Sequence, residues 1–371
     1  MRSSRAFKES LKHSRLNQRI GSLPMDYSLT QFLILGLATF LFVGGLTPVM
    51  RKIAIKIGAL DRPNLDRKTQ KEPVPYLGGV AIAIGITVAS FAALLYSDFS
   101  TETFNIALSV LLPAILISAM GLYDDLRGLE PWPRLVAQTI AGIAVAIYLI
   151  QNDTLGQAFS NQAINYVVTI IWIVGICNSI NFFDNLDGGA SGTVAVISVF
   201  LFAIAFDLGQ SLVSALAIVT AGATLGFLIW NKTPAKIYMG DAGALFLGII
   251  IAVLTIRLDP EVGPQSRALA IPLLLMAVPI LDTTTVVISR LSRGISPFTG
   301  GRDHLSHRLM RKGLGRKATA YVLWGMAAAF GSIAYLTCCV SFTFATQVIW
   351  ASAAIWLFSL VVFLRIPASD E

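Results

Sequence analysis

The sequence has few charged residues and few of the side chains that build metal sites or disulfide frameworks. Only 13% of its 371 residues are Asp, Glu, Lys or Arg, whereas a soluble domain carries roughly 25%. Its three cysteines have neither zinc-ligand nor disulfide spacing. The sequence also lacks a glycine-rich phosphate loop and any signature of a nucleophilic Ser or Cys. These absences exclude a soluble globular domain, a thiolate metal protein and a P-loop nucleotide hydrolase.

Apolar residues are in excess, at 55% of the chain. A membrane-spanning helix needs about 20 predominantly apolar residues. Eleven such spans can be placed, at residues 29–50, 76–97, 104–122, 134–151, 163–180, 189–206, 209–230, 242–257, 268–289, 318–338 and 343–364. The sequence therefore predicts an all-α polytopic membrane protein with one transmembrane domain over residues 29–365, a basic tail over 1–28 and a short tail over 366–371.

Basic residues lie mostly on one side of these spans. The loops on that side and the C-terminal tail carry 20 of the 28 Lys and Arg residues, which predicts a cytoplasmic location for them and an outside N-terminus. The same rule accounts for the net charge of +7 without a nucleic-acid partner. Six basic residues within 1–28 oppose this orientation. We expect that translation starts instead at Met25, just before the first span.

Acidic residues gather at span ends on the predicted cytoplasmic side. The stretch "GLYDDLRGL" places Asp124 and Asp125 at the end of the third span, as a solvated helix end or as a pair neutralised by a cation. In "NSINFFDNLDGG", Asp184 and Asp187 share a face if the stretch is helical. Alternatively they belong to a polar turn, which the following glycines would permit.

Three further polar features lie at a span end, in the longest loop and inside a span. In "NKTPAKIYMGDAGALFLG", Asp241 is either a helix N-cap or a metal ligand, and Tyr238 is either an interfacial aromatic or a stacking surface. His304 and His307 are three residues apart but lack a third His or a Cys for zinc. Asp282 lies inside the ninth span, where an acidic residue is either functional or hydrogen-bonded to a Thr or Asn of the bundle.

This set of side chains favours phosphate chemistry. Clustered carboxylates without thiolates suit a hard cation such as Mg²⁺, with Mn²⁺ as the alternative. A divalent cation close to Lys, Arg and His side chains is typical of phosphoryl transfer. Since the protein is embedded in a membrane, the residues predict phosphoryl transfer to or from a lipid at the cytoplasmic surface.

Six motifs together resemble the polyprenyl-phosphate N-acetylhexosamine-1-phosphate transferases. They appear in the order of that family and cover roughly residues 30 to 315: "VPYLGG", "GLYDDLRGL", "NSINFFDNLDGG", "NKTPAKIYMGDAGALFLG", "VPILDT" and "SPFTGGRDHLSHRL". The resemblance implies a Mg²⁺-dependent transfer of HexNAc-1-phosphate, with GlcNAc as the expected sugar, from a UDP-sugar to undecaprenyl phosphate, with release of UMP. It also implies a bacterial plasma-membrane location, and a homodimer as an alternative to a monomer.

The resemblance assigns roles to individual residues. Asp241 becomes a Mg²⁺ ligand, and Asp184 lies close to the metal and the phosphates. Asp124, with Asp125 beside it, positions or deprotonates the lipid phosphate. The positions of the uridine site match Lys71, Asn181, Asn185, Leu186, Asp187, Asn231 and Tyr238. The positions of the loop that reads the sugar and diphosphate match Arg302, His304, His307 and Arg308.

The sequence departs from the family pattern at three positions. Ser306 stands where a His is common, which argues against a UDP-MurNAc-pentapeptide substrate. Asn185 stands where a Gly is common, and Arg134 where a Lys is common. Direct attack by the lipid phosphate and an aspartyl-phosphate intermediate both stay open. Two other functions are a carrier with Asp282 in a proton relay and a catalytically silent polyprenyl-phosphate-binding paralogue.

Overall fold

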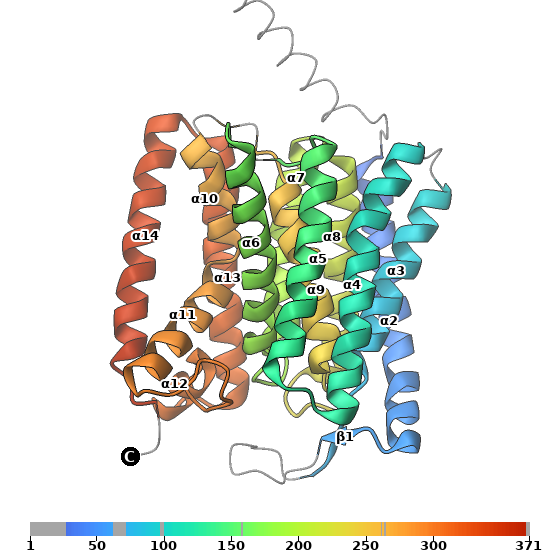
Figure 1. Cartoon of the computed structure of the whole chain (residues 1–371), viewed down its shortest axis with the longest axis vertical. Helices are drawn as coiled ribbons and strands as arrows, with labels where there is room; N and C mark the ends of the chain where they lie inside the picture. The colour runs from blue at the N-terminus through green and yellow to red at the C-terminus, as the bar shows by residue number, and fades with distance from the viewer. Residues whose placement is uncertain are drawn as a thin grey trace, which may run out of the picture.

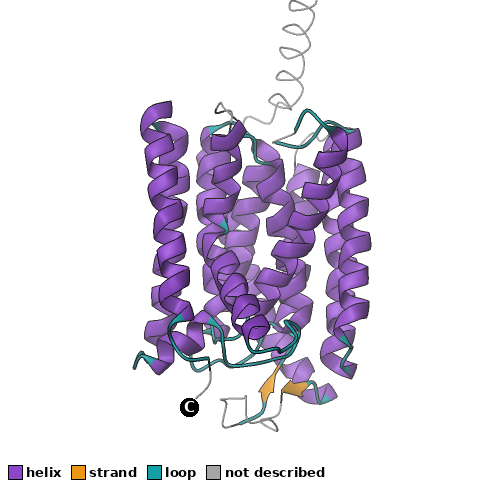
Figure 2. Cartoon of the chain, turned by 60° about the vertical axis from the view of Figure 1, so that its left-hand side comes forward, coloured by secondary structure: helices purple, strands orange, loops and turns teal. Residues whose placement is uncertain are grey.

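The computed structural model describes residues 27–61, 72–96, 100–156, 159–260, 262 and 265–368. Over these ranges the chain forms a bundle of long helices that run side by side, with short loops at both ends (Figures 1 and 2). The elements are α2 (Leu29–Ile57), β1 (Leu60–Asp61), β2 (Val74–Pro75), α3 (Gly78–Tyr96), α4 (Thr101–Arg127), α5 (Pro131–Gln151), α6 (Gln162–Phe183), α7 (Gly189–Asp207), α8 (Ser211–Asn231), α9 (Gly240–Arg257), α10 (Gln265–Leu275), α11 (Ala277–Ser292), α12 (Leu305–Arg311), α13 (Arg316–Cys339) and α14 (Phe342–Leu364).

The helices confirm a multi-pass membrane protein. Within the described residues, ten helices are long and apolar enough to cross a membrane, and the bent pair α10–α11 makes eleven if it counts as one span. The sequence placed a continuous span over 268–289, but the chain bends there by 74° between Leu275 and Ala277. Two prolines explain the bend. Pro272 removes a backbone donor from α10, and Pro279 fits only the first turn of a new helix.

The core of the bundle surrounds α9. All its residues from Ala242 to Thr255 are buried, whereas α14, at the edge of the bundle, buries only Ala345, Ser352 and Phe363. Helix α4 approaches α9 so closely that a Cβ atom on Gly121 would lie 2.6 Å from the backbone oxygen of Asp241. The N-terminus of the central helix is thereby fixed against α4, and Asp241 lies in its first turn.

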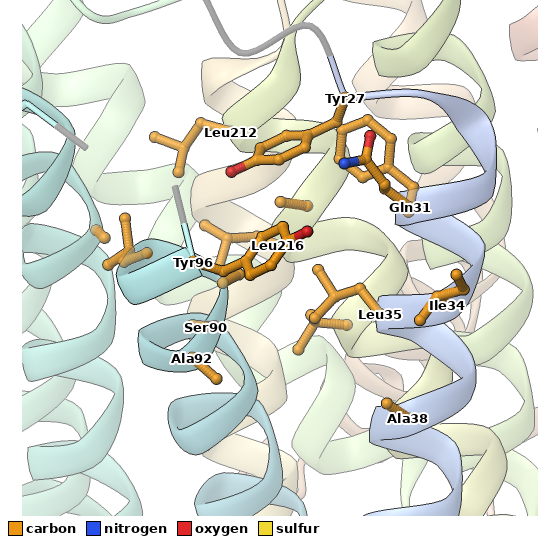
Figure 3. Close-up of a pocket in the computed structure, with 16 residues that line it drawn as sticks. Tyr27, Gln31, Ile34, Leu35, Ala38, Ser90, Ala92, Tyr96, Leu212 and Leu216 are labelled. Atoms are coloured by element: carbon orange, nitrogen blue, oxygen red, sulfur yellow. The ribbon is translucent and has the colours of Figure 1, made fainter. Parts of the chain in front are cut away.

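The two ends of the bundle differ in character. We call the end that holds β1, β2 and α12 the loop-rich face, and α14 ends on this face as well (Figure 1). An apolar cavity of about 400 Å³ lies at the opposite end, between α2, α3 and α8 (Figure 3). Its lining includes Tyr27, Gln31 and Tyr96 but no Asp, Glu, Lys, Arg or His among the described residues. This cavity therefore lacks the charged groups that phosphate chemistry requires.

Two expectations from the sequence concern residues that the structure does not describe. The basic tail over 1–28 lies outside the described residues except for its last two positions, and so does the proposed start at Met25. Lys71, predicted to bind the nucleotide, lies in the undescribed stretch 62–71. All three stay predictions.

Candidate functional site

The C-terminus of α4 caps the N-terminus of α9 at the loop-rich face. The Asp125 carboxylate accepts hydrogen bonds from the backbone N–H groups of Asp241, at 2.9 Å, and Ala242, at 3.1 Å. The first N–H groups of a helix have no partner within the helix, so a carboxylate there is favourable. The N-cap residue is Met239, which supplies no side-chain bond. The interpretation of Asp241 as its own helix cap is therefore wrong, because Asp125 fills that role.

Arg134 joins two of the predicted acids. Its Nη1 lies 2.7 Å from Oδ2 of Asp124 and 2.5 Å from Oδ2 of Asp241. The other oxygen of Asp124 accepts the backbone N–H of Leu129, and Asn181 donates to Oδ1 of Asp241 at 2.8 Å. Asp124 is buried, and both its oxygens are occupied by these contacts. It lies behind the site and holds Arg134 in place.

Helix α6 ends at Phe183, so Asp184 and Asp187 do not continue its helical face. Asp184 is the C-cap residue, and residues 184–188 form a turn that leads into α7. The turn alternative is therefore confirmed, and the prediction that Asp184 and Asp187 share one face of a helix is wrong. Gly188 has a φ of 71°, a left-handed conformation that favours glycine and lets the chain reverse at this point.

This turn is tied to the segment between α8 and α9. Asp187 accepts hydrogen bonds from Arg316 Nη2 and from the backbone N–H of Ala235, both at 3.1 Å. Asn231 accepts the backbone N–H of Gly188 at 3.0 Å and donates to the carbonyl oxygen of Ile237 at 3.0 Å. Asp187 and Asn231, both predicted for the uridine site, therefore fix the shape of the loops and also face the site.

The motif "VPYLGG" joins the site through backbone pairing. The N–H of Tyr238 donates to the carbonyl of Pro75 at 2.8 Å, and the N–H of Gly78 donates to the carbonyl of Tyr238 at 3.0 Å. Tyr76 forms the bridge opposite Tyr238. Although residues 74–79 precede α9 by about 160 positions in the chain, this pairing places both tyrosines beside the same cavity.

These loops and helix ends enclose a cavity of about 370 Å³. Ten residues predicted from the sequence line it: Asp125, Asn181, Asp184, Asn185, Leu186, Asp187, Asn231, Tyr238, Asp241 and His307. Five further lining residues were not predicted: Asp61, Tyr76, Gly240, Gly301 and Arg316. Tyr76 lies within a quoted motif and could have been included. Asp61 and Arg316 look like ordinary loop charges, and the sequence holds no signal that separates them from their neighbours.

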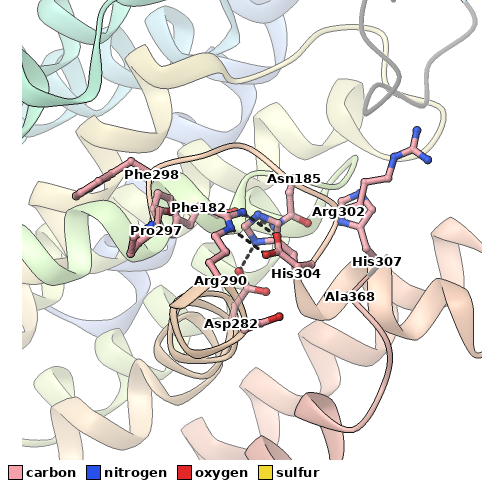
Figure 4. A network of polar contacts seen from close by, with 12 residues as sticks. Phe182, Asn185, Asp282, Arg290, Pro297, Phe298, Arg302, His304, His307 and Ala368 are labelled. Atoms are coloured by element: carbon pink, nitrogen blue, oxygen red, sulfur yellow. Dashed lines mark hydrogen bonds and ion pairs between the residues drawn. The ribbon is translucent and has the colours of Figure 1, made fainter. Parts of the chain in front are cut away.

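The segment that carries His304 and His307, which we call the histidine loop, is anchored on Asp282. Asp282 itself does not line the cavity. Its carboxylate lies 2.8 Å from Nδ1 of His304 and accepts the backbone N–H of Leu305 at 2.7 Å (Figure 4). Asp282 is fully buried, so its charge is balanced by these two contacts. This intramembrane acid is hydrogen-bonded, but its partners are His304 and Leu305 in place of the predicted Thr or Asn, and the effect is to hold His304 next to the site.

The two predicted arginines of this loop do not line the cavity. Arg308 is only 1% exposed, and its guanidinium donates to the backbone carbonyls of Asp303 and Phe363, each at 2.8 Å. Arg302 is half-buried and points away from the pair of Asp282 and His304 (Figure 4). In this arrangement Arg308 stabilises the loop against the end of α14, and neither arginine contacts the cavity that holds His307.

Burial and neighbouring charges shift pKa values in the loops around the cavity, among them those of Asp184 and His307. Burial, with the nearby carboxylates of Asp241 and Asp187, raises the pKa of Asp184 to about 7. Burial, with the charges of His304 and Arg311, lowers the pKa of His307 to about 4. Asp184 therefore titrates near neutral pH, whereas His307 is uncharged there.

The carboxylates fit a cation that arrives with phosphate groups better than a prebuilt metal cage. Within the described ranges, no group of three or more His, Cys, Asp or Glu side chains is arranged to hold a metal ion. Both oxygens of Asp241 are engaged, by Arg134 and Asn181. Asp184 faces the cavity and accepts no side-chain hydrogen bond from any described residue. Mg²⁺ commonly uses one or two carboxylates together with substrate phosphates and water, which suits Asp184 and Asp241.

Comparison with known proteins decides the family. A model described as glycosyl transferase family 4 matches residues 107–259, which include the acids of α4, the turn after α6 and the start of α9. A Bacillus subtilis (strain 168) protein named probable undecaprenyl-phosphate N-acetylglucosaminyl 1-phosphate transferase is 33% identical, over 93% of both chains. The chain belongs to glycosyl transferase family 4. The resemblance drawn from the six motifs is thereby confirmed.

Two further relatives are similar over most of their length. The decaprenyl-phosphate N-acetylglucosaminephosphotransferase of Mycolicibacterium smegmatis is 32% identical over 82% of each chain. The undecaprenyl-phosphate alpha-N-acetylglucosaminyl 1-phosphate transferase of Yersinia pestis is 29% identical over 78% of this chain and 80% of its own.

The bridge made by Arg134 predicts a stability effect. Arg134→Gln leaves the buried Asp124 charged with only one backbone donor, and removing one partner of a buried pair costs about 3 kcal/mol or more. We expect a clear fall in the thermal unfolding temperature in detergent, partly restored in Asp124→Asn/Arg134→Gln. Arg127→Gln, at an exposed position in the last turn of α4, is the matched control. Equal unfolding temperatures for Arg134→Gln and Arg127→Gln would contradict the bridge.

Proposed function

We propose that the chain transfers HexNAc-1-phosphate, in the simplest case GlcNAc-1-phosphate, from a UDP-sugar to undecaprenyl phosphate, with release of UMP. The observation that carries this proposal is the cavity of about 370 Å³ at the loop-rich face, where six of the seven predicted uridine-site residues lie together with Asp125, Asp184 and Asp241. The names of the Bacillus, Mycolicibacterium and Yersinia relatives describe transfer to undecaprenyl or decaprenyl phosphate and support the same reaction.

The charges of the cavity support a divalent cation as cofactor. Five carboxyl groups line it, from Asp61, Asp125, Asp184, Asp187 and Asp241, against the single guanidinium of Arg316. Because His307 is neutral, it adds no positive charge at neutral pH. A diphosphate brought into such surroundings would be repelled unless a cation came with it. Mg²⁺, or Mn²⁺ in its place, would neutralise the diphosphate and the UMP leaving group, with Asp184 and Asp241 as its protein ligands.

The chain itself supplies position and fixed charge. We place the uridine against Tyr238, Leu186 and the turn held by Asn231, and the diphosphate towards Asp184 and the start of α9. The lipid phosphate attacks the β-phosphorus, a new phosphorus–oxygen bond forms to the lipid, and the bond from that phosphorus to the oxygen of UMP breaks. The two groups then react within one site, which supplies much of the acceleration through orientation.

Direct attack by the lipid phosphate is the mechanism that we propose. A phosphate monoester has its second pKa at about 6 and is largely ionised at pH 7, so it needs no strong base. The carboxylate oxygens of Asp124 and Asp125 are occupied by Arg134 and by backbone N–H groups. Both acids therefore serve better as holders of the site than as a nucleophile.

The distribution of charge supports a cytoplasmic location for the cavity in a bacterial plasma membrane. The cavity lies on the loop-rich face, and the loops with most of the basic residues belong to the same face. The positive-inside rule then places the start of α2 outside and the C-terminal tail in the cytoplasm. A homodimer stays a prediction from the resemblance.

The carrier alternative gains no support from the arrangement of the acids. A proton relay would need Asp282 to communicate with a pathway through the bundle, but its carboxylate is closed off by His304 and Leu305. The cavity acids are gathered at one end of the helices, whereas a carrier holds its substrate near the bilayer midplane.

The transfer reaction is tested directly by turnover in detergent. Purified full-length chain is mixed with undecaprenyl phosphate, Mg²⁺ and radiolabelled UDP-GlcNAc, and label in the lipid phase is compared with UMP released. We expect equal amounts of both, and a loss of about 100-fold or more in Asp241→Asn, because a proposed ligand of the cation that neutralises the phosphates is removed. Asp153→Asn, at the opposite end of the bundle, is the control.

The assay separates an error in the sugar from an error in the reaction. Label that enters the lipid phase only with another UDP-HexNAc would correct the sugar and keep the mechanism. Absence of transfer from every UDP-HexNAc tried would refute the proposed reaction.

The raised pKa of Asp184 predicts how cation binding depends on pH. Below its pKa of about 7 the carboxyl is protonated and cannot bind a cation, so affinity rises as pH increases through 7. From pH 6 to pH 8 the ionised fraction rises roughly tenfold, and we expect the Mg²⁺ concentration for half-maximal activity to fall by about that factor. Asp184→Asn should flatten this dependence. A pH-independent Mg²⁺ requirement in the unaltered chain would contradict the assignment.

A further inference from the structure

The two departures from the family pattern in the cavity loops, Asn185 and Ser306, contact each other. They are 121 positions apart in the chain, and the Ser306 hydroxyl donates a hydrogen bond to Oδ1 of Asn185. Ser306 is 2% exposed, whereas Asn185 lines the cavity. The turn after α6 and the histidine loop are joined at this point (Figure 4). A hydrogen bond between two unusual residues indicates that they work as a pair.

The hydrogen bonds of this pair fix which atoms donate. The amide of Asn185 donates from Nδ2 to the carbonyl of Phe182 at 2.8 Å, so its Oδ1 must face Ser306. An amide oxygen can only accept, and the single proton of the Ser306 hydroxyl is therefore used there. The same hydroxyl oxygen lies 3.2 Å from Nδ1 of His307 and can only accept from it. Nδ1 of His307 accordingly carries the proton, and Nε2 carries a lone pair.

His307 is thereby presented as a hydrogen-bond acceptor. It lines the cavity, and its low pKa keeps the ring neutral at the pH where the other groups work. A neutral nitrogen with a lone pair suits an N–H or O–H donor, whereas the oxygens of a diphosphate offer only further lone pairs. Two parts of a UDP-sugar carry such donors: the uridine, in its uracil N–H and ribose hydroxyls, and the hexosamine, in its acetamido N–H and hydroxyl groups. Because the proposed function places the uridine against Tyr238, the hexosamine is the part left to face His307.

We propose that Asn185 and Ser306 form a specificity-determining pair that holds His307 as a hydrogen-bond acceptor for an N–H or O–H group of the hexosamine. Both are positioning residues that act through His307. This proposal rests on the proposed function, because it requires a UDP-hexosamine in the cavity. It refines two predictions from the sequence. Asn185 was predicted to bind the uridine and is now placed next to the sugar. His307 was predicted to contact the sugar and the diphosphate and is now placed against the sugar alone.

Each member of the pair is needed for the other. Without the Asn185 oxygen, the Ser306 proton is free to turn towards Nδ1 of His307, and the histidine then carries its proton on Nε2 and becomes a donor. Without the Ser306 hydroxyl, nothing in this network selects between the two forms of the ring. Asn185→Ala should therefore weaken sugar binding by making His307 a donor, and Ser306→Ala should weaken it by leaving the ring in both forms. The double variant should behave as Ser306→Ala alone.

The test measures binding to the full-length chain in detergent with Mg²⁺. Affinities are determined by calorimetry for UDP-GlcNAc, for UDP-glucose, which lacks the acetamido group, for UDP-GalNAc, which differs at one hydroxyl, and for UMP. We expect the unaltered chain to discriminate among the three UDP-sugars. Ser306→Ala should weaken binding of the preferred sugar nucleotide about tenfold, as expected for one lost hydrogen bond, and leave UMP within about twofold. The analogue that loses affinity identifies the donor that His307 reads.

Two controls separate positioning from folding. Ser306→Thr keeps the hydroxyl and should recover most of the lost affinity, and Ser296→Ala, at an exposed position of the same loop, should bind as the unaltered chain does. Nitrogen chemical shifts of labelled histidine, assigned by their loss in His307→Gln, should show Nδ1 protonated and Nε2 unprotonated. Protonation at Nε2, or equal losses of UMP and sugar-nucleotide affinity in Ser306→Ala, would overturn the proposal.

The same data distinguish the failure of this inference from that of the proposed function. Sugar discrimination lost in Ser306→Ala would support the pair even if no label reached the lipid phase in the turnover assay. Efficient lipid transfer by a chain whose affinities for the three UDP-sugars are equal would refute the pair and leave the reaction standing.

Discussion

The carboxylate of Asp125 at the start of α9 is the contact on which the site depends. It satisfies two backbone N–H groups that would otherwise lack partners at the buried end of the central helix. By doing so it joins the end of α4 to the start of α9 and sets where Asp241 points. The close approach of Gly121 to the backbone of Asp241 removes the remaining freedom between the two helices. The site is therefore built where these two helix ends are joined.

The gathered acids are stable together because most of them have donors of their own. Asp124 has Arg134 and a backbone N–H, Asp187 has Arg316 and a backbone N–H, and Asp282 has His304 and a backbone N–H. Asp184 lines the cavity without such a donor among the described residues, and burial beside the carboxylates of Asp241 and Asp187 raises its pKa. A place where negative charge accumulates without protein donors is where a cation belongs in the proposed reaction.

Much of this could be predicted from the sequence because a membrane protein restricts where polar residues lie. Apolar runs located the spans, and charge placed the loops that carry the chemistry on one side. Ten of the residues chosen from the motifs share one cavity. The bend after Leu275 was missed because the apolar run continues through it, although Pro272 and Pro279 marked the place.

Other features depend on contacts between distant segments, which local pattern does not reveal. Nothing in the sequence around Arg308 shows that its guanidinium is used up by carbonyl oxygens near the end of α14. The motif pattern singled out Asn185 and Ser306 separately as unusual, yet only the fold brings them together. Asp61 and Arg316 enter the cavity for the same reason, through the pairing of loops far apart in the chain.

A structure of the chain with UDP-GlcNAc and Mg²⁺ bound would test the central claim most directly. The account predicts uridine beside Tyr238 and the turn over 186–188, the diphosphate and metal between Asp184 and Asp241, and the hexosamine within hydrogen-bond distance of Nε2 of His307. A nucleotide bound outside this cavity would contradict the account. A diphosphate held by Arg308, with no metal between Asp184 and Asp241, would contradict it as well.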